Sequence, residues 1–150
     1  MASTRTSIPK HARPVYDALD TLDASVDLDP RLRELVKLRA SQLNGCPFCV
    51  DMHSRDARAA GEDERRLWGV AAWRHHPLFD ERERAALALT EAMTPLVRGG
   101  VPDSVYDEAA RFFDERELAN LIGAIISINA WNQLAVATLL EPPIDVGAAS

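Results

Sequence analysis

Residues 118–140 form an unbroken stretch of 23 residues without a charged side chain. A helix of this length could span a bilayer. Polar side chains recur along it, and each is costly to expose to lipid; they are Asn120, Ser127, Asn129, Asn132, Gln133 and Thr138. No cluster of basic residues flanks the stretch to orient it in a membrane. We therefore interpret it as a buried helix of the core or of a subunit contact, and we expect no membrane partner.

The rest of the chain also follows helical patterns, and no period-two strand is evident. Aromatic residues make up only 6% of the sequence, whereas alanine, leucine, arginine and glutamate are abundant, a composition that favours helix. A length of 150 residues suits one compact domain. We predict a single all-α domain over residues 1–150, with a loose N-terminal arm and C-terminal tail. The net charge of -6 argues against nucleic acid as a partner, because phosphate binding depends on lysine and arginine.

Start and stop signals divide this domain into about six to seven helices. Asp29–Pro30 begins one helix as N-cap and first helical residue, and Asn44–Gly45 ends it. Capping boxes at Asp80-x-x-Glu83 and Asp114-x-x-Glu117 open two others. The expected boundaries are about 14–22, 30–43, 46–61, 62–75, 80 to a break at Gly99–Gly100, 102–113 and 114–140. Several of these helices have more apolar surface than a monomer of this size can bury, so we expect a homo-oligomer.

The first residues, MASTRTSIPKHARP, contain no apolar segment of the length that a secretory signal needs. We therefore expect a cytoplasmic protein, whose thiols are kept reduced. A close cysteine pair in that compartment is more often catalytic, redox-sensing or metal-binding than a structural cross-link.

Cys46, Cys49 and His53 are spaced by three and four residues, which places them along one face of a helix. Two cysteines one helical turn apart are close enough for a disulfide. A thiolate is favoured at a helix N-terminus, in a Cys-x-x-Cys motif and beside a basic group, and His53 can accept a thiol proton. Glu34, from the preceding helix, is a candidate for fixing the tautomer of that histidine. The spacing predicts a thiol-redox site.

Other interpretations of these residues stay open. The two cysteines and His53 could be three zinc ligands, with His75, His76 or a carboxylate as the fourth. The cysteines could also be inert, since a free cysteine often serves as a small buried hydrophobe. A pocket could be lined from the uncharged helix by Asn129, Trp131 and Asn132, although buried side chains of these types usually have satisfied hydrogen bonds.

The segment from Glu34 to Gly61 resembles the AhpD-like, carboxymuconolactone decarboxylase family. The family pattern is a glutamate, a cysteine twelve residues later and then Cys-x-x-Cys-x-x-x-His; it is matched here by Glu34, Cys46, Cys49 and His53. The segments WRHHPLFDERERAALALTEAMT and INAWNQLAVAT are also similar to single-domain members. The resemblance therefore covers about residues 14–140.

This resemblance implies an AhpD-like helical bundle, assembled as trimers or hexamers, with alkylhydroperoxidase-type activity. It assigns peroxide attack to Cys49, resolution to Cys46, and proton relay to His53 and Glu34, with no cofactor or metal. The implied partners are a hydroperoxide substrate and an external dithiol or protein reductant. Some members carry a histidine between the cysteines where this chain has Phe48. The expected proton relay therefore has one group fewer in this chain.

Three other functions are also compatible with the sequence. The chain could be a disulfide reductase or redox sensor of the same fold, or a non-catalytic zinc-binding module. The family also includes decarboxylases of a lactone ring, which lack the cysteine pair as a working unit, so the intact motif counts against that class.

Overall fold

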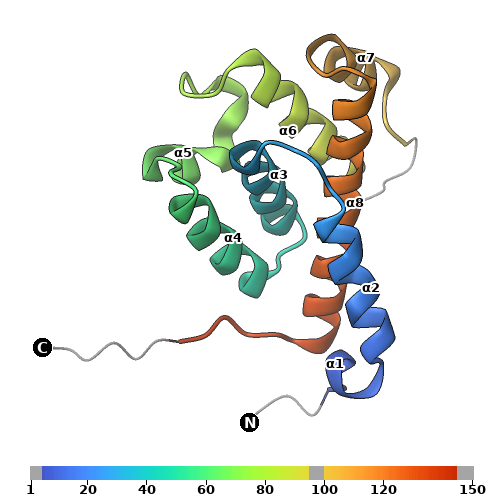
Figure 1. The fold of residues 1–150 in the computed structure, drawn as a ribbon. Coiled ribbons are helices and arrows are strands. Elements are labelled where there is room, and N and C mark those ends of the chain that lie inside the picture. Colours follow the sequence, from blue (N-terminus) through green and yellow to red (C-terminus); the bar gives the residue numbers. More distant parts are fainter. Residues whose placement is uncertain (1–4, 95–99, 145–150) are drawn as a thin grey trace, which may run out of the picture.

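The computed structural model describes residues 5–94 and 100–144, and these residues form an all-helical bundle (Figure 1). Within them there are eight α-helices, one 3-10 helix and no strand. In chain order the elements are α1 (Ile8–His11), α2 (Arg13–Ala24), α3 (Pro30–Leu43), α4 (Pro47–Ala59), α5 (Glu64–Gly69), η1 (Val70–His75), α6 (Glu81–Met93), α7 (Asp103–Phe112) and α8 (Glu115–Thr138). The predicted all-α, AhpD-like fold class is confirmed.

Helix α8 runs the length of the molecule and organises the bundle (Figure 1). It begins at the predicted capping box, in which the Asp114 side chain accepts from the Glu117 backbone and the Glu117 side chain accepts from the Asp114 backbone. By length and composition alone, α8 could cross a membrane, but the core helix of a globular protein meets the same test. Since α2, α3, α4, α6 and α7 all pack against it, we interpret α8 as the central helix of the core.

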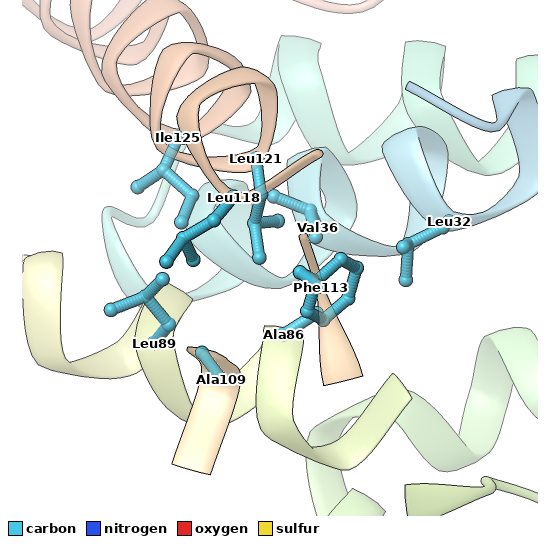
Figure 2. Packing of buried hydrophobic residues seen from close by; sticks show 9 residues of the cluster. All are labelled: Leu32, Val36, Ala86, Leu89, Ala109, Phe113, Leu118, Leu121 and Ile125. Atoms are coloured by element: carbon cyan, nitrogen blue, oxygen red, sulfur yellow. The ribbon is translucent and has the colours of Figure 1, made fainter. Parts of the chain in front are cut away.

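One hydrophobic cluster joins α8 to α3, α6 and α7 (Figure 2). Its buried members are Leu32, Val36, Ala86, Leu89, Ala109, Phe113, Leu118, Leu121 and Ile125. Burial of this apolar surface is the main favourable contribution to folding. The cluster fixes the N-terminal half of α8 against α3, and α3 in turn carries part of the candidate site.

A second hydrophobic cluster lies between α3, α4, α5, η1 and α6; it comprises Leu35, Leu38, Ala57, Leu67, Val70, Trp73, Phe79 and Leu87. Leu35 and Val36 are neighbours in the sequence, yet they belong to different clusters and both are fully buried. Helix α3 is therefore held between the two clusters. This placement fixes the surface at which α3 meets α4.

The structure differs from the predicted helix boundaries in two regions. Residues 62–75 do not form one helix, because the backbone of Ala72 leaves the helical region and η1 follows α5 instead. The His76 ring lies 2.8 Å from the place where a Cβ on Gly69 would stand, so the chain folds back tightly at this point. The expected helix over 14–22 is longer, at Arg13–Ala24, and is preceded by the short helix α1.

Other boundaries agree or fall outside the described residues. Both predicted capping boxes are present, and Asp29 caps α3 by accepting from the Leu32 backbone. Helix α6 ends at Met93, before the predicted break; Gly99 and the last part of the predicted tail, residues 145–150, lie outside the described residues, as do residues 1–4 of the predicted arm.

Candidate active site

The two cysteines lie at the beginning of α4. Gly45 adopts a positive φ of 63°, which glycine tolerates without strain, and this turn lets α4 fold back against α3. Cys46 is the N-cap of α4, Pro47 occupies its first turn, and the Cys46 sulfur accepts a hydrogen bond of 3.2 Å from the Cys49 N–H. Both sulfurs are buried and joined in a disulfide, with 5.4 Å between the Cα atoms. The pair can therefore close without unwinding the helix.

His53 lies one turn after Cys49 and is also buried. Its Nδ1 is 2.8 Å from the carboxylate of Glu34, which comes from α3. When Nδ1 carries the proton it donates to this carboxylate, so Nε2 is left as an acceptor. The structure thus brings Glu34 and His53 together as the sequence pattern predicts, on the same helix pair that carries the cysteines.

These residues border a cavity of about 390 Å³. Its lining comprises Tyr16, Asp20, Asp23, Arg33, Glu34, Lys37, Phe48, Cys49, Met52, His53, Asp56, Trp131, Leu134, Ala135 and Leu140. Cys49 is among them, whereas Cys46 is not among the described residues of the lining. Of the two cysteines, Cys49 is therefore the one that lines this cavity.

A charged cluster forms another part of the wall. The buried Lys37 ammonium contacts both carboxylate oxygens of Asp23, at 2.7 and 2.9 Å, and Arg33 contacts the same carboxylate at 2.8 Å. The Ser127 hydroxyl donates to Asp23 at 2.8 Å. Burial on its own would raise the pKa of Asp23, but the hydrogen bonds and positive charges of these partners outweigh it and lower the pKa. Asp23 therefore stays ionised and links α2, α3 and α8.

Among the described residues, the group that could hold a metal ion shares His53 with the alternative zinc site considered from the sequence but contains neither cysteine. Ligand atoms of Glu34, His53 and Asp56 lie within 4.8 Å of one another. In the predicted set, the cysteines are bonded to each other, and His76 instead packs against Phe79 and accepts from the Leu78 backbone.

Sequence reasoning missed part of the cavity wall. Tyr16, Asp20, Asp23 and Lys37 carry no motif. The three residues of α2 reach the site because α2 packs against α8 and Asp23 forms ion pairs with α3. Among the three residues considered for a pocket, Trp131 does line the cavity, and its ring stands edge-on to Tyr16 at a centroid distance of 5.0 Å.

The two asparagines considered with Trp131 instead have structural hydrogen bonds. Asn132 accepts from Asn44 and donates to Ser41. Asn129 also accepts from Asn44 and donates to Thr94. These bonds tie α8 to the ends of α3 and α6. Neither residue is among the described lining of the cavity at Cys49, but Asn129 lines a separate cavity of about 310 Å³.

Comparison with known proteins agrees with this geometry. The carboxymuconolactone decarboxylase family matches residues 11–92, a span that contains the glutamate, both cysteines and the histidine. The chain belongs to this family. A curated relative is the uncharacterized protein YdfG of Bacillus subtilis, which is 42% identical over 105 residues, or 70% of this chain and 71% of the relative. YnjA of Escherichia coli, also uncharacterized, is 38% identical over 100 residues, or 65% of this chain and 53% of YnjA.

Solved structures of similar proteins agree with the family's fold. A protein of unknown function from Agrobacterium tumefaciens, suggested to be the antioxidant defence protein AhpD, is 34% identical and superposes with a TM-score of 0.90 over 95% of this chain and 99% of its own. The debrominase Bmp8 shares the fold, with a TM-score of 0.75 at 20% identity over 87% of this chain and 70% of its own. This member of the decarboxylase family is therefore close in structure to an AhpD-like protein.

Proposed function

We propose that this family member is a thiol-dependent, alkylhydroperoxidase-like peroxidase. Its cysteine pair would cycle between dithiol and disulfide, with Cys49 attacking the peroxide, Cys46 resolving, and His53 and Glu34 relaying protons. The observation that carries the proposal is the hydrogen bond between His53 and Glu34 in the wall of the cavity that Cys49 also lines. A buried histidine held in one tautomer, one turn from a thiol, is the arrangement that general-base activation of a nucleophile requires.

The first step is attack on the peroxide. Nε2 of His53 takes the thiol proton of Cys49, and the thiolate attacks one oxygen of the hydroperoxide. The O–O bond breaks, sulfur is oxidised to a sulfenic acid, and the proton returns through His53 to the leaving oxygen, which departs as an alcohol or water. Glu34 keeps the imidazole oriented and stabilises the positive charge that it carries between the two transfers.

The second step is resolution by Cys46. Its sulfur attacks the sulfenic sulfur of Cys49, a disulfide forms and one water leaves. The Cys46 sulfur accepts the Cys49 N–H at the beginning of α4, and such a donor favours its thiolate form. An external dithiol or a protein reductant then returns both cysteines to thiols by exchange. No metal or cofactor takes part in these steps.

The experiment compares single-cysteine variants in a peroxide-consumption assay driven by excess dithiothreitol. Cys49→Ser should abolish the rapid reaction with peroxide. Cys46→Ser, reduced first and then freed of dithiothreitol, should consume about one equivalent of peroxide and leave a sulfenic acid that a dimedone-type probe labels. Ser54→Ala, on the same helix but outside the cavity lining, is the control and should turn over normally. Full turnover by Cys49→Ser would contradict the assignment of roles.

A disulfide reductase is the second candidate, and the disulfide between Cys46 and Cys49 favours it. In this case the reduced pair would pass its electrons to a protein or small-molecule disulfide. Comparing kcat/KM for hydroperoxides with kcat/KM for disulfides separates the two functions. Insensitivity to thiol alkylation would instead point to lactone decarboxylation.

The assembly and the location remain proposals as well. Large apolar side chains are exposed on the single chain, among them Trp68 and Ile126, and such surface supports a homo-oligomer of the trimer or hexamer type. Sedimentation analysis of the purified protein tests this. We propose a cytoplasmic location because reversible dithiol chemistry needs a reducing compartment.

A further inference from the structure

The charges around the cavity do not balance. Four carboxylates line it and only two cations do; they are Asp20, Asp23, Glu34 and Asp56 against Arg33 and Lys37. Both cations form ion pairs with Asp23, so neither is paired with Asp20, Glu34 or Asp56. The cavity therefore carries surplus negative charge.

Asp20 and Asp56 supply this surplus. Both are exposed, and neither side chain has a hydrogen-bond or ion-pair partner among the described residues; an oxygen of Asp56 lies within 4.8 Å of a ring nitrogen of His53. They come from different helices, α2 and α4, and so border the cavity on two sides. A molecule that occupies the cavity beside Cys49 therefore lies near two carboxylates that form no ion pair with lysine or arginine among the described residues.

An aromatic pair lies beside one of these carboxylates. Tyr16 precedes Asp20 by one turn on α2, which puts both on the same helix face, and the Tyr16 ring contacts Trp131 edge-on at 5.0 Å. All three line the cavity. The Arg13 guanidinium already stands over the Tyr16 ring, 5.8 Å from its centroid, so the pair attracts a further organic cation through whatever ring surface Arg13 leaves uncovered, by the ring quadrupole. This pair is an observation independent of the acidic residues, and it indicates the same kind of ligand.

We propose that the cavity selects its reductant by charge and takes a cationic aminothiol in preference to a neutral or anionic thiol. The inference rests on the proposed dithiol–disulfide cycle of Cys46 and Cys49. It names Asp20, Asp56 and the Tyr16–Trp131 pair as the residues that determine this preference.

The chemistry of reduction explains why charge matters. Of the two cysteines, Cys49 alone is among the described lining residues. An external thiolate would therefore attack the Cys49 sulfur, and the bond to Cys46 breaks with Cys46 leaving as a thiolate. A second thiolate then attacks the external sulfur of the mixed disulfide, which releases the oxidised reductant and the Cys49 thiolate. Two electrons pass to the protein in all. The attacking species is an anion, so a compensating ammonium group lowers the cost of bringing it between Asp20 and Asp56.

The size of the effect follows from Coulomb's law. At about 6 Å from a carboxylate in a water-like dielectric, one unit charge on the thiol changes the rate of reduction by about threefold. Replacing the ammonium group of the thiol by a carboxylate is a change of two unit charges and therefore changes the rate by about tenfold. Salt at about 1 M shortens the screening length to roughly 3 Å and should remove most of this difference.

The experiment measures reduction of the oxidised, full-length protein by cysteamine, mercaptoethanol and mercaptopropionate at low ionic strength. Each rate constant is calculated per thiolate. It is then divided by the rate constant of the same thiol with a neutral small-molecule disulfide, which removes differences in intrinsic reactivity between the thiols. Cysteamine should exceed mercaptopropionate by at least about tenfold, with mercaptoethanol between them, and the ratio should collapse at high salt. Equal rates, or the reverse order, would overturn the proposal.

Variants separate this selectivity from the peroxidase reaction. Asp20→Asn and Asp56→Asn should each narrow the cysteamine-to-mercaptopropionate ratio by about threefold or more, while Asp107→Asn, exposed on α7, should leave it unchanged. An unaltered ratio in the Asp20→Asn, Asp56→Asn double variant would also overturn the inference. Disulfide reduction is followed without peroxide, so the two proposals can fail separately. A protein that fails to react with hydroperoxide, but is still reduced fastest by cysteamine and slowest by mercaptopropionate, would contradict only the proposed peroxidase activity.

Discussion

His53 Nδ1 lies 2.8 Å from the Glu34 carboxylate, and this contact joins α4 to α3 in the wall of the cavity that holds Cys49. The side chains of both residues are mostly buried, at 5% and 15% exposed, so solvent screens the pair only weakly. The contact holds Nδ1 at the carboxylate and leaves Nε2 as the ring nitrogen available to the proposed relay. It is therefore the most direct target for testing the proposed relay.

Glu34→Gln should lower the rate at which peroxide oxidises the reduced protein by about 10- to 100-fold, because the amide cannot stabilise the imidazolium that forms during proton transfer. Stopped-flow measurement of a single oxidation under excess peroxide checks this. Glu81→Gln, outside the cavity on α6, is the matched control. If Glu34→Gln oxidised at the wild-type rate while the control behaved normally, the relay would be wrong.

Phe48→His should raise the peroxide reaction rate severalfold. Phe48 lines the cavity next to Cys49, and some members of the resembled family have a histidine at this position, which would add a second group able to take or return a proton. The pH profile of the single-turnover rate should gain an ionisation near that of histidine, about pH 6.5. Phe48→Leu is the control for lost ring volume; an equal increase in that variant would indicate easier access and not proton transfer.

The helices with strong local signals could be predicted from the sequence. The caps at Asp80 and Asp114 and the Asp29–Pro30 start are local, and all three occur where expected. The division after Gly69 was not predicted: the backbone leaves the helical region at Ala72, and the His76 ring lies close against Gly69. Local patterns therefore gave most helix starts, but not the division of residues 62–75 into α5 and η1.

The candidate site divides in the same way. The cysteines and His53 share one helix, so their spacing alone places them together, whereas Glu34 needed the family pattern because it comes from another helix. Asp20 and Tyr16 were missed because nothing in the sequence says which face of α2 meets the cavity. Residues of one helix could be predicted as a group, and residues that meet only by packing could not.

Stability should fall at acidic pH through Asp23. Burial alone would raise its pKa, but Lys37, Ser127 and Arg33 lower it in the folded protein. A lowered folded pKa means that the stabilisation is fully present above the unfolded value of about 3.9 and is lost as the pH falls through the folded value. Chemical denaturation between about pH 7 and pH 2 should therefore show a decline in the free energy of unfolding that starts near pH 4.

Asp23→Asn tests the assignment of that decline. The variant should be less stable at pH 7 by about 3 kcal/mol, because Lys37 stays buried without its carboxylate partner, and its acid decline should be shallower than in the wild type. The pKa values of Glu62 and Glu91 are also lowered, so these two carboxylates contribute part of the acid decline in both the wild type and the variant. Asp107→Asn serves as the control. An Asp23→Asn curve parallel to the wild type would show that this carboxylate does not carry the pH dependence.

Two adjacent isoleucines on α8 offer a matched test of the core and of the predicted assembly. Ile125 is fully buried in the cluster of Figure 2, whereas Ile126 is 50% exposed on the single chain. Ile125→Ala should cost about 3 kcal/mol in the free energy of unfolding, because it removes buried methyl groups and leaves a cavity. Ile126→Ala should change the stability of an isolated chain by no more than about 0.5 kcal/mol. Denaturation at several protein concentrations tests whether Ile126 lies in a subunit contact. A large loss of unfolding free energy in Ile126→Ala that depends on protein concentration would place this residue in such a contact. A small loss that does not depend on concentration would place it in solvent.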